Sequence, residues 1–451
     1  MKNNQASVAA PQSADGTPPP GDIDEQREQW SKAADEHRRK MEDQARTIRD
    51  LILAQPPIQL LGYVWAQFHM GVLADLREKQ EEYRPDKKLV ENFQLVLEYL
   101  HAVWSCHANL ADERTPLDEA KAGALFDTFD ELKTSNFLYC MSSSAANRSS
   151  ATEGKTESQA KFSWALIRGN RYQVLEEEFF AFVLAPHADA LQKIYGMEPN
   201  AIAAEIQAMA NSIRTGVGQS IETIATRMEE THALMADKKQ DMAAAIASLS
   251  QTDATFTREV EGAFRDLLFG GICNLSRHTR LTAPLLEDIS YLPGENTVFF
   301  AEGEFAGTPM RTLPARVRPG IKLGGDYYIT DGTFARDASY RAIQRGLLNR
   351  DPEYREEWNR RQKTLIEQAY PTIFTNQLAD ATVYSEVYFQ DAKTGQWVES
   401  DLLIILDDVL LIVEAKAGVM VMHSPATNFD RHERTIRELI IKAYEQCNRF
   451  V

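Results

Sequence analysis

The stretch that decides the fold of the C-terminal part is 397–420, WVESDLLIILDDVLLIVEAKAGVM. Two five-residue apolar runs, 402–406 and 409–413, flank the acidic pair Asp407 and Asp408. Two polar residues between two apolar runs are a β-hairpin signal. The segment therefore predicts two antiparallel strands joined by a tight turn.

The register of this hairpin brings charged residues together. If the acidic pair forms the loop, Asp401 lies directly opposite Glu414. Opposed residues have Cβ atoms about 4.5–5.5 Å apart, and like charges there are destabilising unless something compensates them. Lys416 projects from the same face because strand side chains alternate. We expect a cluster of two carboxylates and a lysine, compensated by a divalent cation.

The surroundings of the cluster admit two interpretations. Apolar runs on both sides of the turn predict a sheet covered on both faces, with the cluster at the rim of a core. The alternative is a plain cross-strand salt bridge, since the same register places Glu399 opposite Lys416. That alternative leaves Asp401 facing Glu414 without compensation, so we prefer the cation site.

The order of these residues resembles that of the PD-(D/E)xK nuclease superfamily, which has the restriction-endonuclease-like fold. Asp401 is followed, after 12 intervening residues, by Glu414-Ala415-Lys416. A glutamate-bearing helix is expected before this pattern and a glutamine-bearing helix after it. The VEAKAG run is most similar to the nuclease-related (NERD-like) and defence-associated branches. The resemblance covers roughly residues 350–451.

The resemblance implies roles for individual residues. Asp401, Glu414 and the backbone carbonyl of Ala415 would bind Mg²⁺ or Mn²⁺. Lys416 would orient or help deprotonate the attacking water and stabilise charge on the phosphate. Mg²⁺ takes hard oxygen ligands and keeps several waters, which suits this set. Ser400 stands where the name of the motif has proline.

Two flanking residues complete the implied site. Glu367 matches the glutamate of the preceding helix, with Glu356 and Glu357 as competitors for the same role. Gln446 matches the glutamine of the closing helix, where it is in line with the apolar residues at 439, 443 and 450. Periodicity alone also allows Gln446 to lie at the edge of this stripe and reach solvent. The resemblance favours the site.

The chain before this domain is expected to be mainly α-helical. Residues 1–23 are rich in Pro, Ser, Ala and Gly and indicate a disordered leader, and 24–290 show helical periodicity. The Ser-rich stretch 141–160 predicts a loop and a subdomain break. Apolar residues recur every seven positions at Ile221, Met228, Met235, Met242 and Leu249. We prefer an intramolecular helical hairpin with methionines filling its core over a dimeric coiled coil.

Residues 291–337 carry β-branched and aromatic residues between Gly and Pro and predict a β-rich connector. Helices are expected at 338–348 and 352–369, with Pro371 ending the second. The expected C-terminal domain, 338–451, is an α/β restriction-endonuclease-like domain with a mixed sheet flanked by helices. Because this fold commonly continues with a further strand and helix, we expect a domain truncated after Val451.

The net charge of −17 is unevenly placed. Residues 301–451 carry only −3, and within them 311–363 hold 12 basic and 7 acidic side chains, a local surplus of +5. Such a surplus suits phosphate contacts. The candidate nucleic-acid contacts are the arginines of this stretch: Arg311, Arg316, Arg318, Arg341, Arg345, Arg360 and Arg361.

These observations predict a cytoplasmic, Mg²⁺- or Mn²⁺-dependent nuclease. DNA is expected rather than RNA, endonuclease rather than exonuclease action, and a role in defence against foreign DNA. The four scattered cysteines indicate neither disulfides nor a zinc site, and no stretch has the ~20 apolar residues of a membrane span. The alternative is an inactive nuclease-fold scaffold whose helical region binds a protein partner or a second copy.

Overall fold

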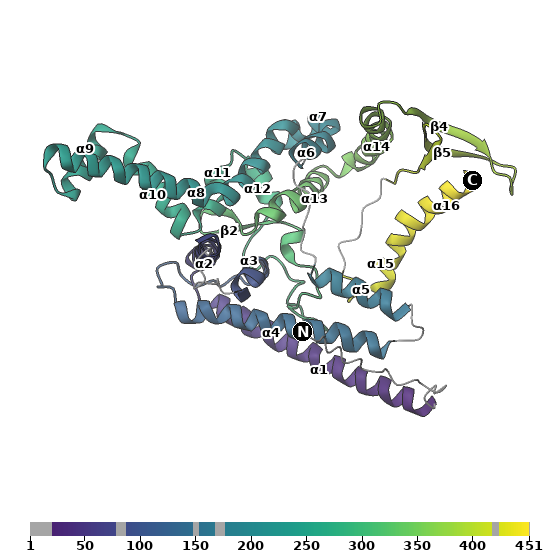
Figure 1. Cartoon of the computed structure of the whole chain (residues 1–451), viewed down its shortest axis with the longest axis horizontal. Helices are drawn as coiled ribbons and strands as arrows, with labels where there is room; N and C mark the ends of the chain where they lie inside the picture. The colour runs from purple at the N-terminus through teal and green to yellow at the C-terminus, as the bar shows by residue number, and fades with distance from the viewer. Residues whose placement is uncertain (1–19, 78–86, 148–152, 167–175, 417–423, 451) are drawn as a thin grey trace, which may run out of the picture.

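A computed structural model describes residues 20–77, 87–147, 153–166, 176–416 and 424–450. Within these ranges the chain is mostly helical and contains two three-stranded β-sheets (Figure 1). The expected class, a helical region followed by a small α/β unit, is confirmed at this level. Most of the expected leader lies outside the described residues, and its last residues begin helix α1 at Pro20.

The helical elements before the first sheet follow one another with short connections. In chain order they are α1 (Pro20–Leu53), α2 (Pro57–Arg77), α3 (Lys87–Cys106), α4 (Glu119–Ala146), α5 (Glu153–Leu166), α6 (Glu176–Leu184), α7 (Ala188–Tyr195), α8 (Pro199–Lys238), α9 (Met242–Thr252), α10 (Phe256–Leu268), α11 (Leu275–His278) and α12 (Ala283–Ile289).

Helices α1 and α4 lie side by side along much of their lengths (Figure 1). Met41, Ile48 and Ile52 recur at helical spacing on α1 and are fully buried, as an amphipathic helix requires. The expected loop at 141–160 is wrong at both ends, because α4 continues to Ala146 and α5 begins at Glu153. Ser142 and Ser143 in this stretch are buried.

Helices α8, α9 and α10 extend from the rest of the molecule as an arm (Figure 1). The expected heptad column does not follow one helix, because α8 ends at Lys239, whose φ is 49°. Asp241 then caps α9 by accepting from the N–H of Ala244 at 2.8 Å. The intramolecular hairpin is confirmed, since α9 packs on α8. Its expected methionine core is wrong, because Met228 and Met242 are exposed.

The connector forms the first sheet, with β2 (Gly320–Leu323) between β1 (Ser290–Tyr291) and β3 (Asp326–Ile329). Strands β2 and β3 are antiparallel, and β1 is parallel to β2. Between β1 and β2, residues 295–305 form turns around the buried Phe299 and Phe305.

The remaining elements carry the chain from the core to the second sheet. They are α13 (Gly332–Arg350), α14 (Arg355–Gln377), β4 (Thr382–Gln390), β5 (Trp397–Leu406), β6 (Val409–Val413), α15 (Phe429–Ile436), a π-helical turn (Arg437–Ile441) and α16 (Lys442–Phe450). We call α1–α13 with β1–β3 the helical body, because α13 packs on α8 and α12. Strands β4–β6 with α15 and α16 are the C-terminal unit.

Helix α14 joins these two parts. Trp358, near its start, is buried in the core of the body, and its later turns contact β4 and β5. Pro371 was expected to end this helix, but it lies inside it. A proline removes one backbone donor, and α14 continues six residues further to Gln377, where the N–H of Leu378 bonds to the carbonyl of Phe374.

The second sheet has the order β4-β5-β6 with both pairs antiparallel. Leu402 and Ile404 on the central strand β5 are buried, but the apolar residues of β6 are not. Leu410 is 50% exposed, and Val409 and Leu411 are also exposed. The expectation of a sheet covered on both faces is therefore wrong for the described residues, in which β6 is an open edge.

Candidate functional site

The hairpin has the predicted register. Leu402 pairs with Val413, and Leu406 pairs with Val409, so Asp407 and Asp408 form the turn. Asp407 adopts a φ of 53°, a left-handed conformation that Asp tolerates better than most residues. The open end of the hairpin therefore carries Asp401 on β5 and Glu414 immediately after β6.

Asp401 holds the backbone that follows β6. Its Oδ2 accepts a hydrogen bond from the N–H of Ala415 at 2.6 Å. This contact replaces the next pair of the β-ladder, which ends at Val413. The Asp401 carboxylate is thus fixed beside the Glu414-Ala415-Lys416 segment.

Lys416 links the hairpin to the closing helix. Its Nζ donates to Oε1 of Glu414 at 2.6 Å and also to Oε1 of Gln446, which lies on α16. The side chain of Glu414 is only 7% exposed and that of Lys416 27% exposed. A buried carboxylate of this kind requires a charged partner. Gln446 therefore faces the cluster, and the alternative in which it points to solvent is wrong.

Among the ion pairs of the described residues, the alternative salt bridge between Glu399 and Lys416 is absent. Glu399 instead pairs across the sheet with Tyr388 on β4. The Glu399 carboxylate is the main cause of a raised pKa of the Tyr388 hydroxyl. Glu399 thus belongs to the β4–β5 ladder, and the partners of Lys416 are Glu414 and Gln446.

Cys447 is a further member of this site that sequence reasoning missed. Its Sγ lies 3.8 Å from the carbonyl of Ile412 on β6. Burial raises the pKa of the thiol, and Glu414 and Asp401 raise it further, whereas Lys416 lowers it. All three charged residues are therefore near Cys447. The signal was present, because Cys447 follows Ala443 of the apolar stripe by one helical turn.

Glu367 has a different environment. It lies on α14 and pairs with Lys363 at 3.4 Å on an exposed face. Among the described residues, no hydrogen bond or ion pair joins it to Asp401, Glu414 or Lys416. Its competitor Glu357 pairs with Arg360 and Arg361, which lower the pKa of its carboxyl to about 2.

The oxygen atoms of the cluster could supply some of the ligands that a hard cation needs. Hydrogen bonds of the described residues engage Oδ2 of Asp401 and Oε1 of Glu414, so Asp401 Oδ1 and Glu414 Oε2 can serve as ligands beside the Ala415 carbonyl. In the described ranges, no group of three or more His, Cys, Asp and Glu side chains is arranged to hold a metal. A cation here would take two carboxylates and complete its shell with backbone oxygen and water, as Mg²⁺ does.

Most of the candidate nucleic-acid arginines already have intramolecular partners. Arg311 and Arg345 donate to backbone carbonyls, Arg345 to that of Val317. Arg316 lies over the Trp164 ring at 4.9 Å. The others form ion pairs: Arg318 with Glu295 at 2.6 Å, Arg360 with Glu357, and Arg361 with Asp189 and Glu357. Arg341 lies near Arg345 on α13. These contacts distribute the arginines over several parts of the surface, six of them partly buried and Arg360 exposed.

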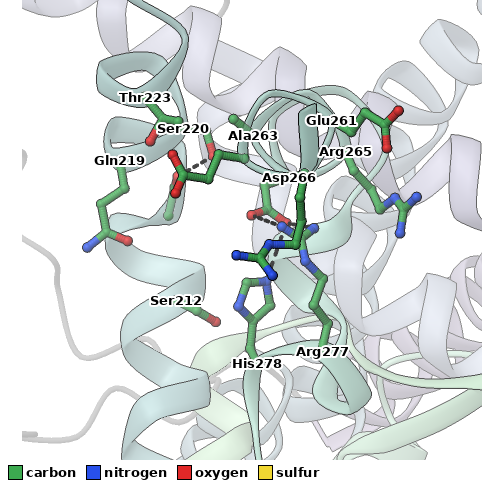
Figure 2. A pocket seen from close by; sticks show the side chains of 14 residues that line it. Ser212, Gln219, Ser220, Thr223, Glu261, Ala263, Arg265, Asp266, Arg277 and His278 are labelled. Atoms are coloured by element: carbon green, nitrogen blue, oxygen red, sulfur yellow. Dashed lines mark hydrogen bonds and ion pairs between the residues drawn. The ribbon is translucent and has the colours of Figure 1, made fainter. Parts of the chain in front are cut away.

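A separate polar cavity of 530 Å³ lies in the arm, between α8, α10 and α11 (Figure 2). Asp266 and Arg277 pair at its centre through two hydrogen bonds, one of 2.9 Å, and His278 Nε2 lies 3.3 Å from Asp266. A Cβ at Gly262 would lie 2.8 Å from the Arg277 guanidinium, so the Arg277 side chain would have to shift if this residue were larger. These groups satisfy one another and stabilise the base of the arm.

Comparison of this chain with protein-family models, curated proteins and solved structures finds no match. None of the helices in the described ranges combines the length and apolar character needed to cross a bilayer.

Proposed function

We propose that the C-terminal unit is a nuclease that hydrolyses phosphodiester bonds with Mg²⁺ or Mn²⁺. The observation that carries the proposal is the position of Lys416, which lies between the Glu414 carboxylate and the Gln446 amide while Asp401 holds the adjacent backbone. Two acidic groups and one ammonium on a rigid hairpin are the arrangement that phosphoryl chemistry needs.

Each residue of the cluster has a task in this reaction. The cation would polarise the phosphate and lower the pKa of water, and Asp401 and Glu414 would hold it. The Lys416 ammonium stabilises negative charge on the phosphoryl oxygens as the water oxygen bonds to phosphorus and the bond to the leaving sugar oxygen breaks. The attacking water releases a proton to solvent, and the leaving sugar oxygen takes one from solvent. Gln446 restricts Lys416 to one position, which lowers the entropic cost of reaching the transition state.

We further infer DNA as the substrate in preference to RNA, endonucleolytic cleavage, and a role in defence against foreign DNA, all of which rest on the resemblance of the VEAKAG hairpin. A cytoplasmic location is consistent with the cysteines, since Cys106, Cys140, Cys273 and Cys447 are free thiols. Arg360, whose side chain is 67% exposed, is the candidate for phosphate contact that is most accessible to a duplex.

The test is cleavage of supercoiled plasmid DNA in the presence of Mg²⁺. We expect Asp401→Ala and Lys416→Ala each to reduce the rate by about 100- to 1000-fold, because each removes charge that acts on the transition state. A chelator should abolish cleavage. Circular dichroism should show that both variants remain folded.

Matched controls replace the same residue types outside the cluster. Asp408→Ala in the exposed turn and Lys363→Ala on α14 should leave the rate within about twofold of the original protein, because neither residue contacts the cluster. Cleavage that survives both Asp401→Ala and Lys416→Ala would refute this site.

A second candidate function is a non-catalytic scaffold that binds a protein partner through the arm. Ile221, Met228, Met242, Ile246 and Leu268 are exposed large apolar residues on α8, α9 and α10, and such exposure is typical of interaction surfaces. Absence of cleavage by the folded protein with any of Mg²⁺, Mn²⁺, DNA or RNA would favour this function over the nuclease.

A further inference from the structure

A cavity of 820 Å³ lies where the helical body meets the C-terminal unit. Its walls come from the connector between β1 and β2, from α13 and from the turn that begins α15. This volume is within the range of about 300–1,000 Å³ that is typical of small-molecule sites. The cavity is separate from the cluster at Asp401.

One part of the wall is apolar and aromatic. Tyr291, Phe305, Pro314 and Val317 line it, and the first three are buried. The Tyr291 ring is held in place because the guanidinium of Arg318 lies over it at 5.0 Å. A rigid wall of this kind favours a flat, apolar ring.

Another part of the wall is positively charged. Arg311 is fixed because it donates to the carbonyls of Val298 at 2.9 Å and Ala301 at 2.7 Å. These N–H groups are already used, so Arg311 would attract an anionic ligand by its charge rather than by hydrogen bonds through them. Among the described hydrogen bonds, Arg345 uses one guanidinium nitrogen to reach the Val317 carbonyl. Its other N–H groups are available to an anion.

The environment of Arg345 also favours an anionic ligand. Burial lowers the pKa of its guanidinium, Tyr291 opposes this effect, and the neighbouring Arg318 and Arg341 lower the pKa further. An anion in the cavity would offset this unfavourable concentration of like charge. Glu304 is the acidic residue of the wall, and it also lines the smaller adjoining cavity that contains Arg38.

The third part of the wall is the turn that starts α15. Ser424 is buried, Ala426 packs against the core of the body, and both Ala426 and Thr427 line the cavity. The Ser424 carbonyl accepts from the Thr427 hydroxyl at 3.0 Å, which keeps the turn closed. The nearby N-terminus of α15 adds a partial positive charge.

From these features we propose that the cavity binds a mononucleotide-sized molecule in which a flat ring carries an anionic group, with Arg345 holding the anion. The apolar wall receives the ring, and the turn at Ala426 and Thr427 contacts the ligand from the side of the C-terminal unit. The ligand would thus contact both the body and the C-terminal unit. The proposal does not depend on nuclease activity.

Isothermal titration calorimetry with adenosine 5′-monophosphate, in the presence of a chelator, tests the proposal. We expect the monophosphate to bind, and adenosine and inorganic phosphate to bind at least tenfold more weakly, because each supplies one half of the recognition. Arg345→Ala should weaken binding of the monophosphate at least tenfold. Hydrogen exchange should show slower exchange of the amides at 426–431 when the monophosphate is bound.

Further variants distinguish a loss of binding in this cavity from a loss of folding and from binding at another site. Val298→Trp fills the cavity from an exposed position and should also abolish binding, whereas Leu292→Trp, exposed on the same connector but outside the cavity, should not. Asp401→Ala should bind normally, which separates this cavity from the proposed nuclease site. No binding of the monophosphate, or equal binding of adenosine, would overturn the proposal.

Discussion

His187 and Trp358 lie face to face with their ring centroids 3.6 Å apart, where α14 leaves the body. Gln362 Nε2 lies 2.8 Å from His187 Nε2, and Tyr354 Oη lies 2.9 Å from Nδ1. Because an amide nitrogen can only donate, Nε2 accepts and the proton of the neutral ring is on Nδ1. Burial, and then the charge of Arg361, lower the pKa of His187 to about 4.

This histidine makes stability depend on pH. Between its ordinary pKa of about 6.5 and its folded-state pKa of about 4, the unfolded chain binds a proton that the folded protein does not. The free energy of unfolding should therefore fall as the pH drops through this window, with about 1 to 3 kcal/mol lost from this residue. Urea denaturation at pH 7 and pH 4.5 measures the loss.

The variant His187→Gln should reduce this pH dependence without removing it. His101, which is buried and hydrogen-bonded to the Gly320 carbonyl at 2.9 Å, also has its pKa lowered to about 4. A pH dependence as steep in His187→Gln as in the original protein would show that this ring does not contribute.

At the scale of elements, the conformation of Lys239 determines where α8 ends within the arm. Lys239 ends α8 in the left-handed conformation, and its N–H bonds to the Met235 carbonyl. This position is commonly glycine, because a Cβ is disfavoured there.

We expect Lys239→Gly to stabilise the arm by up to about 1 kcal/mol, since it relieves the backbone strain without removing a described contact. Chemical denaturation of the variant measures the gain. Lys238→Gly, one residue earlier and still inside α8, is the matched control and should destabilise by about 0.5–1 kcal/mol. Equal effects of the two variants would contradict this account.

Local chemistry explains which elements the sequence predicts well. The hairpin was predictable with its register because the acidic pair between two apolar runs admits one pairing. The end of α8 before Lys239 was not predicted, because the seven-residue apolar spacing continues past it. Asp241 could have indicated the start of a new helix, since Asp is a common N-cap residue. The helix through Pro371 was missed because a proline inside a helix removes one backbone hydrogen bond, and the other residues of α14 keep the helix intact around it.

The candidate site was predictable only in part for similar reasons. Gln446 faces Lys416 as helical periodicity allowed, whereas Lys416 lies beyond the end of β6, so strand alternation does not explain its contact with Gln446. The contact between Asp401 and the Ala415 N–H was not predictable, because it depends on where the ladder ends. The neighbourhood of Glu367 depends on how α14 lies against the sheet, which no local pattern specifies.

At the scale of the whole molecule, apolar residues are distributed unequally. The helical body, together with the start of α14, buries one continuous core, from Ala34 on α1 to Trp358 on α14. In the C-terminal unit, described apolar side chains remain exposed on β6 and on the closing helix, including Leu410, Ile440 and Tyr444. An exposed apolar edge strand can pair with another chain.

We therefore expect the protein to self-associate through β6 as its concentration rises. Leu410→Lys should suppress this association, because a lysine on an edge strand disfavours pairing with another strand. Sedimentation velocity over a concentration series measures the effect. Ile373→Lys, which replaces an exposed apolar residue on α14, is the control and should not change it. Association that is unaffected by Leu410→Lys would place the contact elsewhere.

The closing helix, 429–450, connects the turn at Ser424 with the charged cluster, so a rotation at its first residues displaces its last ones. It starts at the turn anchored by Ser424 and continues through the π-helical turn to α16. At 1.5 Å per residue, Gln446 lies roughly 26 Å from its start. A tilt of about 10° at the anchored end would move the Gln446 amide by roughly 4 Å, more than its bond to Lys416 can accommodate. Small rotations at the base of this helix are thus sufficient to assemble or dismantle the charged cluster.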